Sequence, residues 1–138
     1  MLVNMSKVEQ GVKGIIVRDK NFLVLKQVVD GNTFFSLPGG RIESDNQETE
    51  LKREIKEETG LEVEVKEFVG EWSFSRSNGS VTRLETYKCV PLSEKISHED
   101  TEKYEDIKEV LWLSREEFLE GGYTDNKSLI EVIKKVEI

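Results

Sequence analysis

The sequence predicts an α/β (α+β) fold in which a mixed β-sheet lies between helices. Short segments rich in β-branched and aromatic residues recur along the whole chain, as in strands. Segments with helical spacing of apolar residues interrupt them at residues 46–60 and 129–136. The length of 138 residues suits one domain, residues 1–138, with a core of its own.

Strands are expected where apolar residues alternate with polar ones between turn signals. These segments are residues 12–18, 22–27, 33–37, 61–69, 71–76, 81–90 and 109–113. Residues 19–21 are expected to turn the first pair into a hairpin. Asn78-Gly79 is typical of a tight two-residue turn.

Two or three helices are expected. Asn46 is a suitable N-cap for the first, and Gly60 stands where a helix often ends. Ser114 and Glu117 have the spacing of a capping box for a short helix that ends before 121–122. The last helix carries apolar residues along one side: Leu129, Ile130, Ile133 and Val136.

The first helix gathers its acidic residues on one side. At about 100° per residue, four carboxylates fall within an arc of about 100° beside the apolar stripe of Leu51 and Ile55. They are Glu50, Glu54, Glu57 and Glu58. Like charges four residues apart each cost a few tenths of a kcal/mol, roughly. A solvated surface is one explanation, and a bound divalent cation is the other. The Pro38-Gly39-Gly40 loop before the helix favours the cation, because glycine lets the backbone approach an ion closely.

This stretch resembles the Nudix box, the signature of the Nudix hydrolase family. The box reads Gly, five residues, Glu, seven residues, Arg-Glu, an aliphatic residue, any residue, Glu-Glu, any residue, Gly and an aliphatic residue. The chain matches it with Gly39, Arg53, Glu54, Ile55, Glu57, Glu58, Gly60 and Leu61. Asp45 stands at the position of the first Glu, and a second alignment starts the box at Gly40 with a loop one residue shorter. The role of Asp45 is therefore open.

The resemblance implies an α/β/α sandwich and metal-assisted hydrolysis of a diphosphate. By this resemblance Glu54 and Glu58 are the main Mg²⁺ ligands, with Mn²⁺ as an alternative ion and Glu57 as a further ligand. A backbone carbonyl of the Gly39-Gly40 loop adds to the shell. The ion neutralises charge on the diphosphate and lowers the pKa of the attacking water. Glu50 and Glu48 are expected to be bystanders.

Catalysis also needs a base and an oriented carboxylate. Arg53 lies four residues before Glu57 and is expected to pair with a carboxylate of its own helix. Glu54 is one candidate base. Glu105, from the acidic stretch before the late strand, is the other, and a solvated surface charge is the competing interpretation. Further residues of that stretch are Glu102 and Asp106 as alternatives and His98, which is expected to be exposed.

Aromatic side chains could stack against the nucleobase of a substrate. Phe35 lies just before the glycine loop, and Trp72 and Phe74 share one face of a strand, where a core role is the alternative. In a two-residue hairpin Phe74 faces Arg83, which is expected to hold a phosphate. Asn126 is either the N-cap of the last helix or a reader of a purine edge.

Composition limits the classes of molecule that the protein is expected to bind. The 28 acidic and 20 basic residues give a net charge of −8, which argues against binding of long nucleic acid. No apolar run is long enough to span a membrane, no signal peptide is recognised, and the single cysteine, Cys89, forms no internal disulfide. We therefore expect a cytoplasmic monomer or homodimer that acts on a small nucleotide.

The expected substrate is an intact or oxidised nucleoside triphosphate. ADP-ribose, a dinucleotide or a nucleotide sugar is the alternative within the same chemistry. Two further alternatives are a non-catalytic nucleotide-binding module of the same fold and an acidic surface that binds a partner protein.

Overall fold

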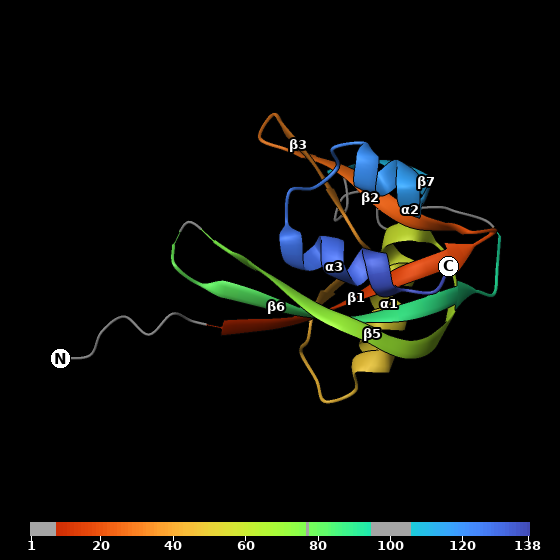
Figure 1. Cartoon of the computed structure of the whole chain (residues 1–138). Helices are drawn as coiled ribbons and strands as arrows, with labels where there is room; N and C mark the ends of the chain where they lie inside the picture. Colours follow the sequence, from red (N-terminus) through yellow and green to blue (C-terminus); the bar gives the residue numbers. More distant parts are fainter. Residues whose placement is uncertain (1–7, 77, 95–105) are drawn as a thin grey trace.

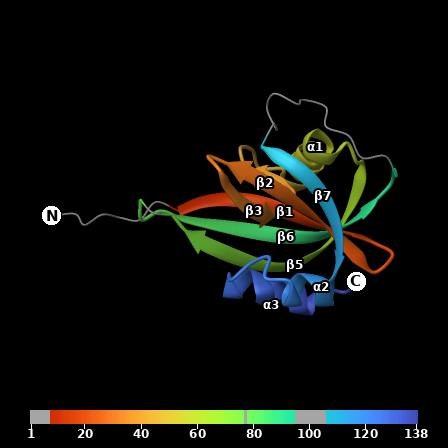
Figure 2. The same cartoon turned by 90° about the horizontal axis from the view of Figure 1, so that it is seen from above.

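The computed structural model describes residues 8–76, 78–94 and 106–138. Figure 1 shows its strands and helices, and the view from above separates the layers, with α1 on one face of the strands and α2 and α3 on the other (Figure 2). The expected mixed sheet between helices is confirmed. The elements are β1 (Val8–Arg18), β2 (Asn21–Val29), β3 (Asn32–Ser36), β4 (Gly39–Arg41), α1 (Gln47–Thr59), β5 (Val63–Ser75), β6 (Val81–Pro91), β7 (Ile107–Ser114), α2 (Arg115–Glu120) and α3 (Lys127–Lys135).

The sheet opens into two halves from one hairpin. β1 and β2 pair only beside their turn, at Val17–Phe22 and Arg18–Asn21. Further along, β1 pairs with β4 and in parallel with β6, while β2 pairs with β3 and β7. Every strand pair except β1–β6 is antiparallel. The two halves therefore diverge away from the turn and leave room between them.

The turn of this hairpin is shorter than expected. Asp19 and Lys20 alone form it, with φ of 53° and 66°. Two consecutive residues at positive φ match the twist that joins antiparallel strands in a two-residue hairpin.

Two hydrophobic clusters hold the helices on the strands. Leu51 and Ile55 of α1 are fully buried in one cluster, with Val12, Ile16, Leu23 and Leu25 of the strands. The other cluster joins α2 and α3 to the opposite face through Phe22, Val24, Trp72, Phe118, Leu129 and Ile133. The apolar stripe predicted for α1 is thus its buried face.

The segments expected as strands 61–69 and 71–76 form one strand, β5. Its pairing with β6 shifts register between Val65 and Phe68 and again between Phe68 and Gly70. Gly70 has φ of 150° and an added Cβ would lie 3.0 Å from Val132 Cγ2. Glycine therefore lets the strand continue through an irregularity beneath α3, where the sequence suggests a break.

The hairpin between β5 and β6 has a different register from the one expected. Ser73 pairs with Arg83 and Phe74 pairs with Thr82, one residue away from the predicted pairing. The Arg76 amide donates to Ser80 O at 2.8 Å, so the loop holds three residues, with Gly79 at φ of 88°. A three-residue loop with a left-handed last residue is the second common hairpin type. The extra residue turns Arg83 to the other face of the strand.

Helix ends follow the sequence closely. Asn46 Oδ1 accepts from the Thr49 amide, Gly60 ends α1 at φ of 79°, and Ser114 and Glu117 form the capping box of α2. β4, expected as a loop, pairs with β1. In the described part of the chain, no helix is long and apolar enough to cross a membrane.

Candidate functional site

The glycine loop and the acidic face of α1 meet at Glu58. The Gly39 amide donates to Glu58 Oε1 at 2.8 Å, and Glu58 is 7% exposed. Gly39 has φ of 144°, and an added Cβ would lie 2.1 Å from Val12 O. Both the conformation and the space therefore require glycine. The backbone of the loop fixes the position of this carboxylate.

Glu54 lies against the next glycine. A Cβ at Gly40 would come within 2.8 Å of Glu54 Cδ. Arg53 Nη2 lies 3.3 Å from Glu54 Oε1, and Arg53 Nη1 donates to both oxygens of Glu57 at 3.2 Å. The pairing of Arg53 with carboxylates of its own helix is as expected. Arg53 thus orients two acidic side chains one turn apart.

Burial shapes the charge of this site. Burial raises the pKa of Glu58 to about 7, against the lowering effects of Lys13 and of the Gly39 amide. The nearby charges of Glu54 and Glu57 raise it further. Lys13 is half-buried and donates to Leu37 O at 3.0 Å. Burial lowers the pKa of Lys13, while Glu58 and Glu54 oppose that effect.

These residues fit a hard divalent cation through oxygen donors. Glu54 and Glu58 lie one helical turn apart. Because Gly40 has no side chain, the backbone of the loop lies close to the Glu54 carboxylate. Within residues 8–76, 78–94 and 106–138, no three His, Cys, Asp or Glu side chains are grouped closely enough to hold one ion. A pair of carboxylates, loop carbonyls, waters and substrate oxygens is the donor set typical of Mg²⁺.

Glu50 holds the segment before α1 in place, and its expected role as a bystander of the metal site stays a prediction. It is 7% exposed, and its two carboxylate oxygens accept from the Glu43 amide at 2.8 and 3.0 Å. Glu50 therefore ties the segment before α1 to the helix. Glu48 is exposed and lies 3.3 Å from Lys52, and Asp45 is exposed.

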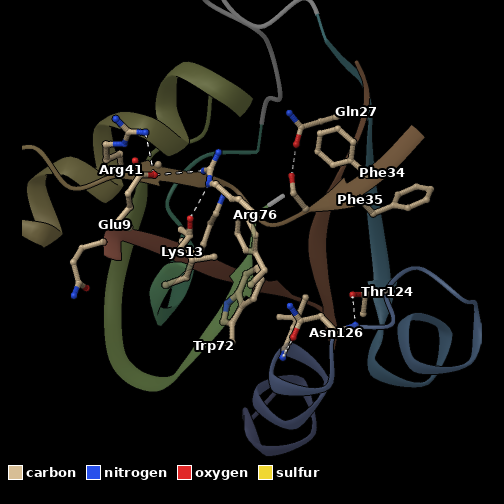
Figure 3. Close-up of a pocket in the computed structure, with 18 residues that line it drawn as sticks. Glu9, Lys13, Gln27, Phe34, Phe35, Arg41, Trp72, Arg76, Thr124 and Asn126 are labelled. Atoms are coloured by element: carbon tan, nitrogen blue, oxygen red, sulfur yellow. Dashed lines mark hydrogen bonds and ion pairs between the residues drawn. The ribbon is translucent and has the colours of Figure 1, made fainter. Parts of the chain in front are cut away.

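A cavity of about 490 Å³ lies between the diverging halves of the sheet, beside the glycine loop. Figure 3 shows the residues around it: Glu9, Arg41, Lys13 and Arg76 gather on one side, and Gln27, Phe34 and Phe35 lie on the other. Gly40 and Lys13 line the cavity and also adjoin the carboxylates of α1. The acidic site therefore adjoins the cavity.

Three of the predicted binding aromatics line this cavity. Trp72 is mainly a core residue, 8% exposed, and its Nε1 donates to Thr86 Oγ1 at 2.9 Å. Phe74 is 37% exposed, with its ring centroid 6.3 Å from that of Trp72. Phe35 packs edge-on against Tyr123. Of these three predicted aromatics, Phe74 has the most exposed side chain.

Asn126 lines the cavity and is also the N-cap of α3. Its Oδ1 accepts from the amides of Ser128 and Leu129, and its Nδ2 donates to Ser73 O at 3.0 Å. The capping role is confirmed. Most of its hydrogen-bonding capacity is used within the protein.

Arg83 does not line the cavity, because the three-residue loop turns it to the exposed far face of β6. Arg76 lines it instead, with its guanidinium carbon 5.5 Å from the centroid of the Phe74 ring. Arg76 and Lys13 are cavity residues that were not predicted from the sequence. Arg76 directly follows β5 and continues the alternation of Trp72 and Phe74, which is the signal that identifies it.

The candidate base Glu105, together with Glu102 and His98, lies outside the described residues. Asp106 is described. Its Oδ2 accepts from Gln27 Nε2 at 2.9 Å, and its carbonyl accepts from the Val28 amide. Asp106 therefore secures the beginning of β7 to β2 and orients a side chain of the cavity wall.

A family model described as the NUDIX domain matches residues 9–133, which include the acidic helix, the glycine loop and the cavity-lining strands. The chain belongs to the Nudix family. The matched residues include the Gly39–Leu61 segment, which resembles the Nudix box.

Relatives of this Nudix chain agree with the assignment. It is 35% identical over 112 residues to a MutT-like protein of Streptomyces ambofaciens, covering 79% of this chain and 66% of that protein. It is 44% identical over 66 residues to an ADP-ribose pyrophosphatase of Methanocaldococcus jannaschii, covering 45% of this chain and 38% of that protein. The chain thus spans under two thirds of the length of these relatives.

A solved structure shows the same fold. The MutT protein from Methanosarcina mazei Go1 superposes with a TM-score of 0.77 at 20% identity, over 96% of this chain and 94% of that one. At this identity the likeness concerns the fold.

Proposed function

We propose that the chain is a Mg²⁺-dependent Nudix pyrophosphohydrolase that cleaves the diphosphate bond of an intact or oxidised nucleoside triphosphate. The observation that carries the proposal is the position of Glu54 and Glu58 against Gly40 and Gly39, at the end of a cavity with cationic and aromatic walls. Family membership and a MutT-like relative support the hydrolase class.

In this proposal Glu54 and Glu58 hold Mg²⁺ (or Mn²⁺), with Glu57 as a further ligand. The bound ion supplies charge neutralisation on the diphosphate and acidification of water. Arg53 orients Glu54 and Glu57, and Gly39 holds Glu58 through its amide.

The remaining roles belong to the cavity and the base. Lys13 faces the cavity beside the carboxylates and contributes positive charge to the binding of phosphate oxygens. Phe35, on the wall of the cavity opposite Arg76, packs against the nucleobase. Glu54 and Glu105 remain the candidate general bases. A cytoplasmic location and a monomeric or dimeric state stay predictions of the sequence.

ADP-ribose is the second candidate substrate, because one relative is named an ADP-ribose pyrophosphatase. A panel of nucleoside triphosphates, ADP-ribose, dinucleotides and nucleotide sugars, each with Mg²⁺, distinguishes these candidates by the products released. A non-catalytic module would bind a nucleotide of the panel and release nothing.

Glu58→Gln tests the metal site directly. Glutamine Oε1 still accepts from the Gly39 amide, so we expect the melting temperature to stay within a few degrees of wild type. The carboxylate charge is lost, so turnover and Mn²⁺ binding, followed by electron paramagnetic resonance, both fall by about 100-fold or more. Near-normal turnover with unchanged Mn²⁺ affinity would exclude Glu58 as a ligand.

A further inference from the structure

The cavity lining is electropositive although the protein is strongly acidic. Lys13, Arg41 and Arg76 line it together with one carboxylate, Glu9, which gives a local charge of +2 (three minus one) against −8 for the chain. Concentration of one sign of charge in a cleft raises the local concentration of ligands of the opposite sign. The cavity therefore suits an anion with more than one negative charge, because Lys13 alone would neutralise only one.

Two of these cations are held by one acidic side chain. Glu9 Oε2 lies 3.2 Å from Arg41 Nη2 and 3.7 Å from Arg76 Nη2. Arg76 Nε also donates to Thr82 Oγ1 at 3.1 Å. Glu9 is 18% exposed, whereas the arginine side chains are 62% and 45% exposed. We name these three residues the Arg41–Glu9–Arg76 cluster.

The cluster is assembled from β1, β4 and the residue that follows β5, and dashed lines in Figure 3 mark its contacts. Arg41 directly follows Gly40, the residue against Glu54. Along β1, Glu9 lies four residues from Lys13, or about 13 Å. The positive charge thus continues from the glycine loop toward the outer end of the cavity. A ligand with its diphosphate at Gly40 reaches the cluster only if it carries a further group on that side.

We propose that the Arg41–Glu9–Arg76 cluster binds the terminal phosphate of a nucleoside triphosphate. Guanidinium groups pair with phosphate oxygens through two parallel hydrogen bonds, and a half-exposed pair with one shared carboxylate has donors to offer. This proposal rests on the proposed function and adds a subsite to it. ADP-ribose places an uncharged ribose where the triphosphate places its last phosphate, so the cluster selects between the two.

The test compares substrates in matched arginine variants. Arg76→Ala removes one guanidinium from the cavity, and Arg83→Ala removes one from the far face of the neighbouring strand as the control. Loss of a charge-assisted hydrogen bond costs about 10- to 100-fold in affinity. We expect kcat/KM of Arg76→Ala to fall by that factor on the triphosphate, mainly through KM, and to change less than about threefold on ADP-ribose. Arg83→Ala matches wild type on both.

Binding of inorganic tripolyphosphate, measured by calorimetry with Mg²⁺, gives a readout without turnover. Arg76→Ala weakens it about 10-fold or more, whereas Glu9→Gln strengthens it severalfold because the competing carboxylate charge is removed. Equal losses of kcat/KM on triphosphate and ADP-ribose, or tripolyphosphate binding unchanged in Arg76→Ala, would overturn the proposal. If no nucleotide is hydrolysed, the proposed function fails, while tripolyphosphate binding still decides the cluster.

Discussion

A single methyl group at residue 40 should damage catalysis and spare the fold. Gly40 has no positive φ, so alanine fits its backbone. The new Cβ would lie 2.8 Å from Glu54 Cδ and 3.0 Å from Glu54 Oε2, about 0.6 Å inside the 3.4 Å at which ordinary contact begins. The clashing atoms end a flexible side chain, so the carboxylate moves and the strand does not.

The size of the effect follows from that displacement. A misplacement of about 1 Å at a reacting centre costs on the order of 100-fold in rate. For Gly40→Ala we expect kcat to fall about 10- to 100-fold, the Mg²⁺ concentration for half-activation to rise, and unfolding free energy to change by less than about 1 kcal/mol. Steady-state kinetics over a Mg²⁺ series and thermal unfolding of the same preparations measure all three quantities.

A double-mutant cycle isolates the clash. Glu54→Ala removes all three of the atoms that a Cβ at residue 40 would meet, Cγ, Cδ and Oε2. Gly40→Ala should then slow the residual activity of the Glu54→Ala enzyme by less than about threefold, a clear departure from additivity. Additive losses, or a wild-type kcat in Gly40→Ala alone, would refute the reasoning that residue 40 acts through Glu54.

Two further predictions concern buried titrating groups. Burial raises the pKa of Glu58 from 4.5 to about 7, so between these pH values the folded metal-free protein holds a proton that the unfolded chain releases. We therefore expect the unfolding free energy of the wild type to fall, relative to that of Glu58→Gln, as the pH rises from 4.5 through 7. Chemical denaturation at several pH values measures this difference. Mg²⁺ must displace this proton, so its affinity, measured by calorimetry, weakens about fivefold from pH 7 to pH 6, and equal affinities would contradict the assignment. Burial raises the pKa of Cys89 to about 12, so at pH 8.5 a thiol reagent should label it about 1000-fold more slowly in the folded protein than in denaturant; comparable rates would show that the thiol is accessible.

Local signals predicted the helix and its site well. The caps of α1 at Asn46 and Gly60, its buried stripe and the Arg53–Glu57 pair all depend on residues a few positions apart. Such spacings fix neighbours on a helix without knowledge of the rest of the fold. The fold class followed as well, because the alternation of strands and helices is itself a local pattern.

Contacts between distant strands could not be predicted in the same way. Asn-Gly indicates a turn at residues 78–79, but the number of loop residues depends on the register of β5 on β6, and one residue moves Arg83 across the sheet. Lys13 reaches Glu58 only because β1 pairs with β4 through Val12–Gly40. The burial of Glu50 was not predicted, because its partner, the Glu43 amide, carries no side-chain signal.

The partial pairing of β1 with β2 bears on how this fold can change over evolutionary time. At the open end, both strands have their backbone groups satisfied by other strands, β4 and β6 for one, β3 and β7 for the other. Side chains such as Gln27, Phe34 and Arg76 project into the space between the halves without taking part in those ladders. Substitutions there alter what the molecule accepts while the backbone bonding of the scaffold is preserved. New ligand preferences can therefore arise on an unchanged framework.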